Sequence, residues 1–184
     1  MERPPKPTIV QSQQQPIPLA YLVTFTCYGA RLHGDPSGSV DRDHNIPGTP
    51  VLAPNPARVS SEQKRARHKP YVMDARRRSL VLKAFQEVCA FRGWTLLAAH
   101  VRTQHIHLVV AAEDGPEKIL HDGKAYATRT LNRWGLDGAN NHRWTRHGST
   151  RYLWKPEQVG AAIHYVVREQ GRPMAVWEHP ERSP

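Results

Sequence analysis

Residues 105–110 have the sequence His-Ile-His-Leu-Val-Val, which constrains the fold more than any other segment of the chain. Side chains on a β-strand point alternately to opposite faces, so His105 and His107 share one face, while Ile106, Leu108 and Val110 share the other. The apolar face requires a core beneath it. The other face carries two imidazoles one pleat apart, close enough to bind one divalent metal together. The segment therefore predicts a strand that borders both a core and a site.

Cap, turn and periodicity signals divide the rest of the chain into strands and helices. Strands are expected at 20–28, 94–102 and 151–154. The Thr103-Gln104 turn joins the second of these to the histidine strand as a hairpin. Helices are expected at 74–93, 116–135 and 156–171, and a short basic helix is capped by Ser60 or Ser61. This order predicts an α+β fold, a ferredoxin-like antiparallel sheet with helices packed on it.

The length of the chain, 184 residues, is that of one domain with a proper core. We expect a disordered tail rich in Pro and Gln at 1–18, a single catalytic domain at 19–178 and a C-terminal tail at 179–184. Within the domain, residues 34–58 form a loop too long to serve only as a connection. The chain shows no signal peptide and no apolar stretch of membrane length, and its two cysteines are expected to be reduced and buried. A cytoplasmic location follows as the expectation.

The charge indicates a polyanionic partner. Lys and Arg number 26 against 16 Asp and Glu, which gives a net charge of +10. Nucleic acid is the favoured partner, and a solvated basic surface is the alternative. Trp134, Trp144 and Trp154 interleave with basic residues, so they serve either base stacking or a core. The basic residues expected to contact phosphates are Arg76, Arg77, Arg78, Lys124, Arg143, Arg146 and Arg151.

The last helix supplies a candidate nucleophile, Tyr165. An apolar stripe recurs at helical spacing along this helix, from Val159 to Val167. Tyr165 lies about 140° from the centre of the stripe, at about 100° per residue, so it is not simply a core aromatic. Glu169 follows one turn later on the same face as Tyr165. Tyr126 is the main rival nucleophile, since Tyr28 and Tyr152 sit on strands as core or base-stacking residues.

These residues suit one reaction. A cation held by His105 and His107 can polarise a phosphodiester, and a tyrosine hydroxyl can attack it to leave a phosphotyrosine. A free phenol ionises near pH 10, so it needs this help. Two imidazoles do not complete a coordination sphere, and Glu169 is the expected third ligand. Histidine and carboxylate ligation with open positions suits Mg²⁺ or Mn²⁺.

The chain resembles the single-tyrosine HUH transposases, which include the REP-associated tyrosine transposases of bacteria. The resemblance rests on the His105-Ile106-His107 strand, on the helix around Lys124-Ala125-Tyr126, and on the strand and helix that end in Tyr165-Val166-Val167-Arg168-Glu169-Gln170. It extends over about residues 20–176.

The resemblance implies a bacterial enzyme that cleaves and rejoins single-stranded DNA at hairpins. It further implies a divalent metal, a 5′-phosphotyrosine intermediate, and a homodimer in which the tyrosine can serve either subunit. Many members carry glutamine four residues after the tyrosine, whereas Glu169 stands there in this chain and Gln170 follows, which leaves both as ligand candidates. The alternative function is a hairpin-binding protein without cleavage. A histidine-triad hydrolase is disfavoured because Val109 occupies the third alternating position.

Overall fold

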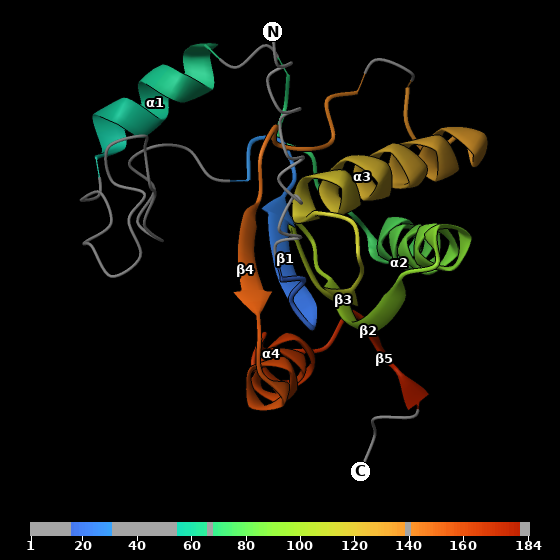
Figure 1. The fold of residues 1–184 in the computed structure, drawn as a ribbon. Coiled ribbons are helices and arrows are strands. Elements are labelled where there is room, and N and C mark those ends of the chain that lie inside the picture. Colours follow the sequence, from blue (N-terminus) through green and yellow to red (C-terminus); the bar gives the residue numbers. More distant parts are fainter. Residues whose placement is uncertain (1–15, 31–54, 66–67, 139–140, 181–184) are drawn as a thin grey trace, which may run out of the picture.

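The computed structural model describes residues 16–30, 55–65, 68–138 and 141–180 (Figure 1). The expected N-terminal tail, the loop at 34–58 and the C-terminal tail lie largely outside these described residues.

The described residues contain a five-stranded antiparallel sheet in the order β4-β1-β3-β2-β5. The strands are β1 (Ala20–Thr26), β2 (Thr95–Val101), β3 (His105–Ala111), β4 (Ser149–Leu153) and β5 (Ala175–Glu178). The first four strands have the order of a ferredoxin-like sheet, with both βαβ crossovers split by a central strand. The predicted α+β class is confirmed. β5 was not predicted, and it pairs with the outer edge of β2.

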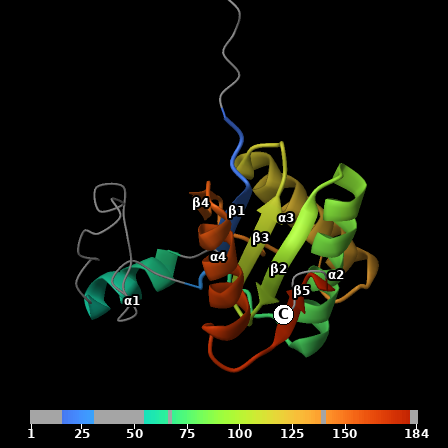
Figure 2. The same cartoon turned by 60° about the horizontal axis from the view of Figure 1, so that its bottom comes forward.

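Helices cover both faces of this sheet. Those that pack on it are α2 (Ala75–Arg92), α3 (Pro116–Arg133) and α4 (Pro156–Arg168), and α1 (Pro56–Arg65) is drawn apart from the sheet in Figure 1. Figures 1 and 2 show α2 and α3 side by side on one face and α4 alone on the other. No helix among the described residues has both the length and the apolar character needed to cross a bilayer.

Local signals explain the helix ends. The Asp74 carboxylate caps α2 by accepting from the Arg77 amide at 2.8 Å, and Gly93 ends the helix with a φ of 71°. The helices α3 and α4 begin at the predicted prolines. The prediction for α1 was wrong, because this helix begins at Pro56 rather than after a serine cap. Proline is favoured in the first helical turn, so it displaces the start toward the N-terminus.

Each face of the sheet has its own apolar core. Phe25, Ile106 and Leu108 pack beneath α2 and α3, while Leu22 and Val109 pack beneath α4. The alternation along β3 is therefore the predicted one, with Ile106 and Leu108 in one core and the histidine face on the side of α4. Because α4 covers only part of that side, the end of β3 that carries the histidines borders a hollow.

Candidate active site

A groove of about 670 Å³ lies at the histidine end of β3, on the sheet face that α4 covers in part. We call it the histidine groove. β1, β3, β4 and α4 all contribute to its walls, together with the loop before β4. The residues that line it are Leu22, Thr24, Phe25, Thr26, Arg102, His105, His107, Thr145, His147, Gly148, Ser149, Arg151, Tyr165 and Gln170.

The two predicted histidines stand side by side on the groove floor. Their ring centroids are 6.4 Å apart and their planes differ by 11°. This separation is the repeat of two residues along a strand, about 6.6 Å. The register of β1 and β3 places Thr24 opposite His107, and the Thr24 hydroxyl lies 3.0 Å from His107 Nδ1. A proton on Nδ1 donated to this hydroxyl leaves Nε2 with the lone pair for a ligand.

Tyr165 reaches the same groove from α4. Its ring centroid lies 6.0 Å from that of His107, and the ring planes are 87° apart. The ring is 38% exposed, whereas Val166 and Val167 beside it are buried under the helix. The tyrosine and the histidines belong to one chain, so this site does not need a second copy to assemble.

The last turn of α4 departs from the sequence expectation. The helix ends at Arg168, and Glu169 is its C-cap with a φ of −101° and a ψ of 6°. The Glu169 amide still donates to the Tyr165 carbonyl at 3.2 Å, but the Glu169 side chain does not line the groove and pairs with His164 at 2.8 Å. Gln170 lines the groove instead, and its Nε2 donates to the Tyr165 carbonyl at 3.1 Å. Of the two ligand candidates, the structure therefore brings Gln170, and not Glu169, to the histidine groove.

A third histidine, His100, lies on the same sheet face opposite His107 and was missed at the sequence level. Its Nε2 accepts from the Met174 amide at 3.2 Å, which leaves Nδ1 to donate to the Val166 carbonyl at 3.1 Å. Burial lowers the pKa of His100, against the opposing effect of the Val166 carbonyl. This neutral, fully buried imidazole ties the end of α4 to the sheet rather than serving the groove.

Arg102 and Arg151 bring positive charge to the rim of the groove. Arg151 is exposed on β4, as a predicted phosphate contact should be. Arg102 was not predicted. It is half-buried, lines the groove as Gln170 does, and donates from Nη1 to the Arg172 carbonyl at 3.2 Å. Of the other predicted contacts, Arg146 is exposed on the loop before β4, and Arg76 is exposed on α2 with its guanidinium 5.5 Å from the Trp134 ring.

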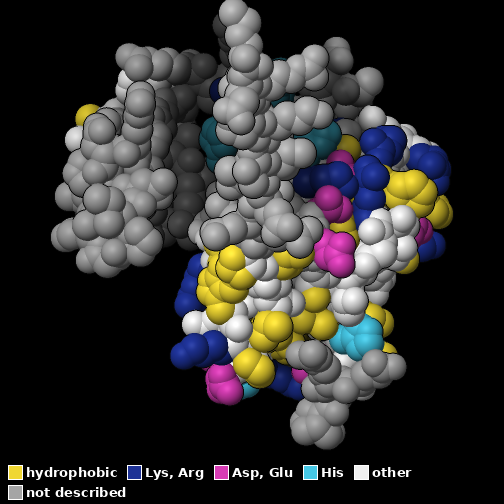
Figure 3. Space-filling model, viewed as in Figure 1, with side chains coloured by type: hydrophobic (Ala, Val, Ile, Leu, Met, Phe, Trp, Pro, Cys, Tyr) yellow, Lys and Arg dark blue, Asp and Glu magenta, His cyan; other side chains and the backbone are white. Residues whose placement is uncertain are grey.

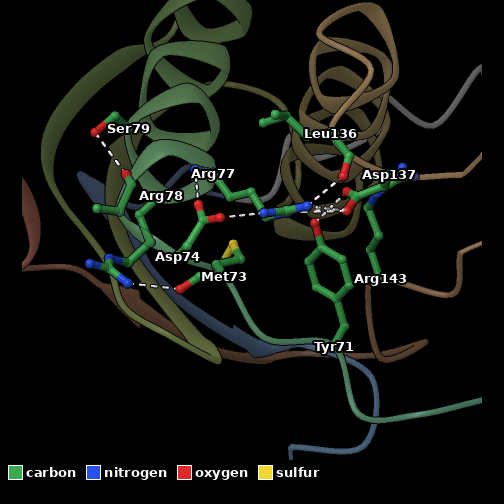
Figure 4. A network of polar contacts seen from close by, with 10 residues as sticks. Tyr71, Met73, Asp74, Arg77, Arg78, Ser79, Leu136, Asp137 and Arg143 are labelled. Carbon is green, nitrogen blue, oxygen red and sulfur yellow. Dashed lines mark hydrogen bonds and ion pairs between the residues drawn. The ribbon is translucent and has the colours of Figure 1, made fainter.

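Two predicted phosphate contacts belong instead to a buried network (Figure 4). The Asp137 carboxylate accepts from Arg143 Nε at 3.0 Å, from Arg77 Nη2 at 3.0 Å and from the Tyr71 hydroxyl at 2.6 Å. Arg77 also pairs with Asp74. The Arg143 side chain is 2% exposed, so the prediction that it contacts DNA was wrong. Its positive charge is needed to stabilise a buried carboxylate.

Lys124 and Arg78 also differ from the prediction of free surface cations. Lys124 Nζ donates to the Thr145 carbonyl at 2.9 Å and lies 4.9 Å from the Phe25 ring centroid, and burial lowers its pKa. It therefore holds the loop before β4 onto α3. Arg78 is half-buried and donates to the Met73 carbonyl at 2.7 Å, at the start of its own helix.

The groove offers part of the ligand set that a divalent cation requires. Among the described residues, no group of three or more His, Cys, Asp or Glu side chains is gathered to hold a metal. His105, His107 and the Gln170 amide oxygen together offer two nitrogen ligands and one oxygen ligand, with the groove open beside them. Nitrogen and oxygen ligands with open positions fit a catalytic divalent ion. The parallel imidazoles must converge by side-chain rotation to share one ion.

No protein-family model and no curated protein matches the chain, whereas similar chains exist among solved structures. One similar solved structure is a REP-associated tyrosine transposase bound to a REP hairpin, with 10% identity and a TM-score of 0.45, covering 86% of this chain and 70% of that one. Another is a candidate transposase from Deinococcus radiodurans R1, with 10% identity and a TM-score of 0.43, covering 86% and 95%. The name of the first falls within the group that the sequence resembles, and the second is named only as a transposase. At this identity the likeness concerns the fold alone.

Proposed function

We propose that this chain cleaves and rejoins single-stranded DNA, with Tyr165 as the nucleophile. The observation that carries the proposal is the position of the Tyr165 ring, 6.0 Å from the His107 ring in the groove that also holds His105. A phenol that lies beside two imidazoles, in a groove with a cationic rim, is an arrangement suited to phosphoryl transfer. Because such an enzyme must reach chromosomal DNA, the proposal includes a cytoplasmic location in a bacterium.

In the proposed step a phosphoryl group passes from one ester oxygen to another, so one phosphate ester bond forms as one breaks. The Tyr165 oxygen attacks a phosphodiester phosphorus, the bond from phosphorus to the 3′-oxygen breaks, and the phenolic proton is released as the 3′-oxygen gains one. The products are a 5′-phosphotyrosine and a free 3′-hydroxyl. The reverse attack by a 3′-hydroxyl on the phosphotyrosine reseals the strand, so cleavage and rejoining use the same residues.

His105, His107 and Gln170 are the residues proposed to hold Mg²⁺ or Mn²⁺. A bound ion would act there as a Lewis acid and would neutralise charge on the phosphoryl oxygens. The Thr24 hydroxyl holds the orientation of His107, and Gln170 is held by its bond to the Tyr165 carbonyl, so nucleophile and ligand share one helix end. Arg102 and Arg151 at the rim attract the DNA backbone.

A covalent-adduct assay tests the proposal. Purified protein is incubated with a labelled hairpin oligonucleotide that carries single-stranded flanks, in Mn²⁺ or Mg²⁺, and the products are separated under denaturing conditions. We expect a protein–DNA adduct that chelation abolishes and that Tyr165→Phe eliminates. Tyr152→Phe is the matched control. Tyr152 lies on the face of β4 opposite the groove, so this variant should form the adduct as the wild type does. An adduct in Tyr165→Phe refutes the assignment. Tight hairpin binding without any adduct favours the non-cleaving alternative.

A second pair of variants separates the two ligand candidates. Gln170→Ala should lower the adduct yield and raise the metal concentration needed for half-maximal yield, since loss of a metal-site residue typically costs 10- to 100-fold. Glu169→Ala removes only the exposed pair with His164 and should leave that concentration unchanged. The reverse result returns Glu169 to the ligand set.

A further inference from the structure

The outer strand of the sheet, β4, carries an exposed aromatic pair that the proposed chemistry does not use. Tyr152 and Trp154 are 48% and 47% exposed, and their rings are 6.2 Å apart with planes that differ by only 12°. Tyr21 packs edge-on against Tyr152 at 5.2 Å and supports it from β1. Figure 3 shows hydrophobic side chains at the surface near the C-terminal end of β4, with Lys and Arg side chains beside them. Single exposed rings are common on protein surfaces, whereas a stacked, supported pair of exposed aromatics marks a binding surface.

The rings of the pair are available for stacking. Their centroids are 6.2 Å apart and their planes differ by 12°, which is about the repeat of two residues along a strand. About half of each residue's surface is exposed, so each ring can offer a face to an unpaired base. Tyrosine and tryptophan faces are the usual stacking partners for unpaired bases.

A basic hollow connects this pair to the histidine groove. The hollow lies between α3 and β4, and its exposed cation is Arg146, with Glu117 as an acidic neighbour. Lys124 also lines it, but its Nζ is bound to the carbonyls of the loop before β4. His147 and Gly148 line both the hollow and the histidine groove, so one loop separates the two. This loop lies so close to β1 that a Cβ at Gly148 would fall 2.8 Å from the Thr24 carbonyl. A polynucleotide chain that leaves the groove therefore crosses only this thin ridge to reach the hollow.

The alternation of β4 continues the path. Ser149 and Arg151 face the histidine groove, whereas Thr150 faces the basic hollow and shares its face with Tyr152. The aromatic pair lies beyond Thr150 on that face. The histidine groove, the basic hollow and the aromatic pair therefore lie in succession around the edge strand β4.

We propose that Tyr152 and Trp154 bind one unpaired nucleobase of a DNA strand whose backbone passes through the basic hollow. The inference rests on the proposed function, whose substrate it makes more specific: single-stranded DNA flanking the cleaved phosphate is read by stacking. The rival occupant is the β4 edge of a second copy. The net charge of +10 on each copy opposes that contact and favours a polyanion.

The test measures equilibrium DNA binding by the wild-type chain with metal chelated, so that no cleavage contributes. Fluorescence anisotropy with a labelled single-stranded oligonucleotide should show affinity about tenfold weaker for Trp154→Ala and for Tyr152→Ala, as loss of one base stack predicts. Trp154→Phe should retain most of the affinity. Trp134→Ala is the matched control, since Trp134 is 53% exposed at the far end of α3 and should bind as the wild type does.

An abasic scan identifies the stacked base. Oligonucleotides with one abasic nucleotide at successive positions are titrated against wild-type protein and Trp154→Ala. At one position the two proteins should bind equally, because the base that Trp154 stacks on is already missing. Stacking leaves the dependence of affinity on salt unchanged, whereas Arg146→Ala should reduce the slope of log K against log salt by about 0.7.

The outcomes separate this inference from the proposed function. Equal binding by Trp154→Ala and Trp134→Ala, or an abasic effect that never depends on Trp154, overturns the stacking site. A loss of self-association in Trp154→Ala without a loss of DNA affinity assigns the pair to a second copy. If the stacking effect holds but no covalent adduct forms, the binding site stands and the proposed cleavage fails.

Discussion

Arg143 and Arg151 stand eight residues apart on one segment, and the structure predicts opposite consequences for their loss. Arg143 is 2% exposed and its partner Asp137 is 4% exposed, whereas Arg151 is exposed on the rim of the histidine groove. Removing one partner of a buried ion pair costs about 3–5 kcal/mol. Asp137 keeps Arg77 and Tyr71 in Arg143→Ala, so we expect the lower end, about 3 kcal/mol.

Urea unfolding followed by tryptophan fluorescence measures this cost, and the melting temperature should fall by about 6–12 °C. Arg151→Ala should change the free energy of unfolding by less than about 0.5 kcal/mol. It should instead reduce the slope of log K against log salt for single-stranded DNA by about 0.7. The reasoning is refuted if Arg143→Ala lowers the stability by less than about 1 kcal/mol, or if it alters the salt slope while Arg151→Ala does not.

Three further predictions concern the packing and titration of the domain. Gly123→Ala should destabilise it by about 1–3 kcal/mol in the same urea assay, because the new Cβ would clash with the Phe85 ring. A wild-type midpoint would contradict the described packing of α2 on α3. Burial raises the pKa of the Cys27 and Cys89 thiols to about 12. Neither thiol should therefore react with a thiol reagent at pH 8 until urea unfolds the chain. Rapid labelling of the native protein would contradict the described burial of these two residues. Burial raises the pKa of Asp137, but the hydrogen bonds from Tyr71, Arg143 and Arg77 lower it overall. The stability that this carboxylate contributes is therefore present above the ordinary carboxyl pKa and is lost as the pH falls through the lower folded value. Asp137→Asn should weaken this acid dependence of unfolding, and an unchanged acid midpoint would contradict the role assigned to Asp137.

Local signals carried most of the fold. The Asp74 cap, the Gly93 stop and the prolines at 116 and 156 identified three helices, because each acts within one turn of the chain. β5 escaped prediction because four residues are too few to establish an alternation, and its pairing depends on the free edge of β2 far away in sequence.

The site was predictable where it depended on periodicity. His105, His107 and Tyr165 share the histidine groove because strand and helix periods hold through those positions. Glu169 and Gln170 exchanged places because the helix ends between them and Tyr165.

Long-range partners were not predictable. The sequence does not distinguish an arginine that faces solvent from a buried one such as Arg143. The partner of Arg143, Asp137, also binds Arg77, which lies on α2, far away in sequence. The placement of Arg102 and His147 in the groove likewise depends on how the hairpin and the loop before β4 fold against each other.

The central claim is that the Tyr165 oxygen becomes bonded to a DNA phosphate. The most direct measurement is mass spectrometry of the adduct after nuclease and trypsin digestion, which leaves a nucleotide remnant on the modified peptide. Residues 152–168 form one tryptic peptide that holds both Tyr152 and Tyr165, so fragmentation within it compares the two directly. We expect the remnant on Tyr165 and an unmodified Tyr152. A remnant on Tyr152, Tyr126 or any residue outside the histidine groove would contradict it.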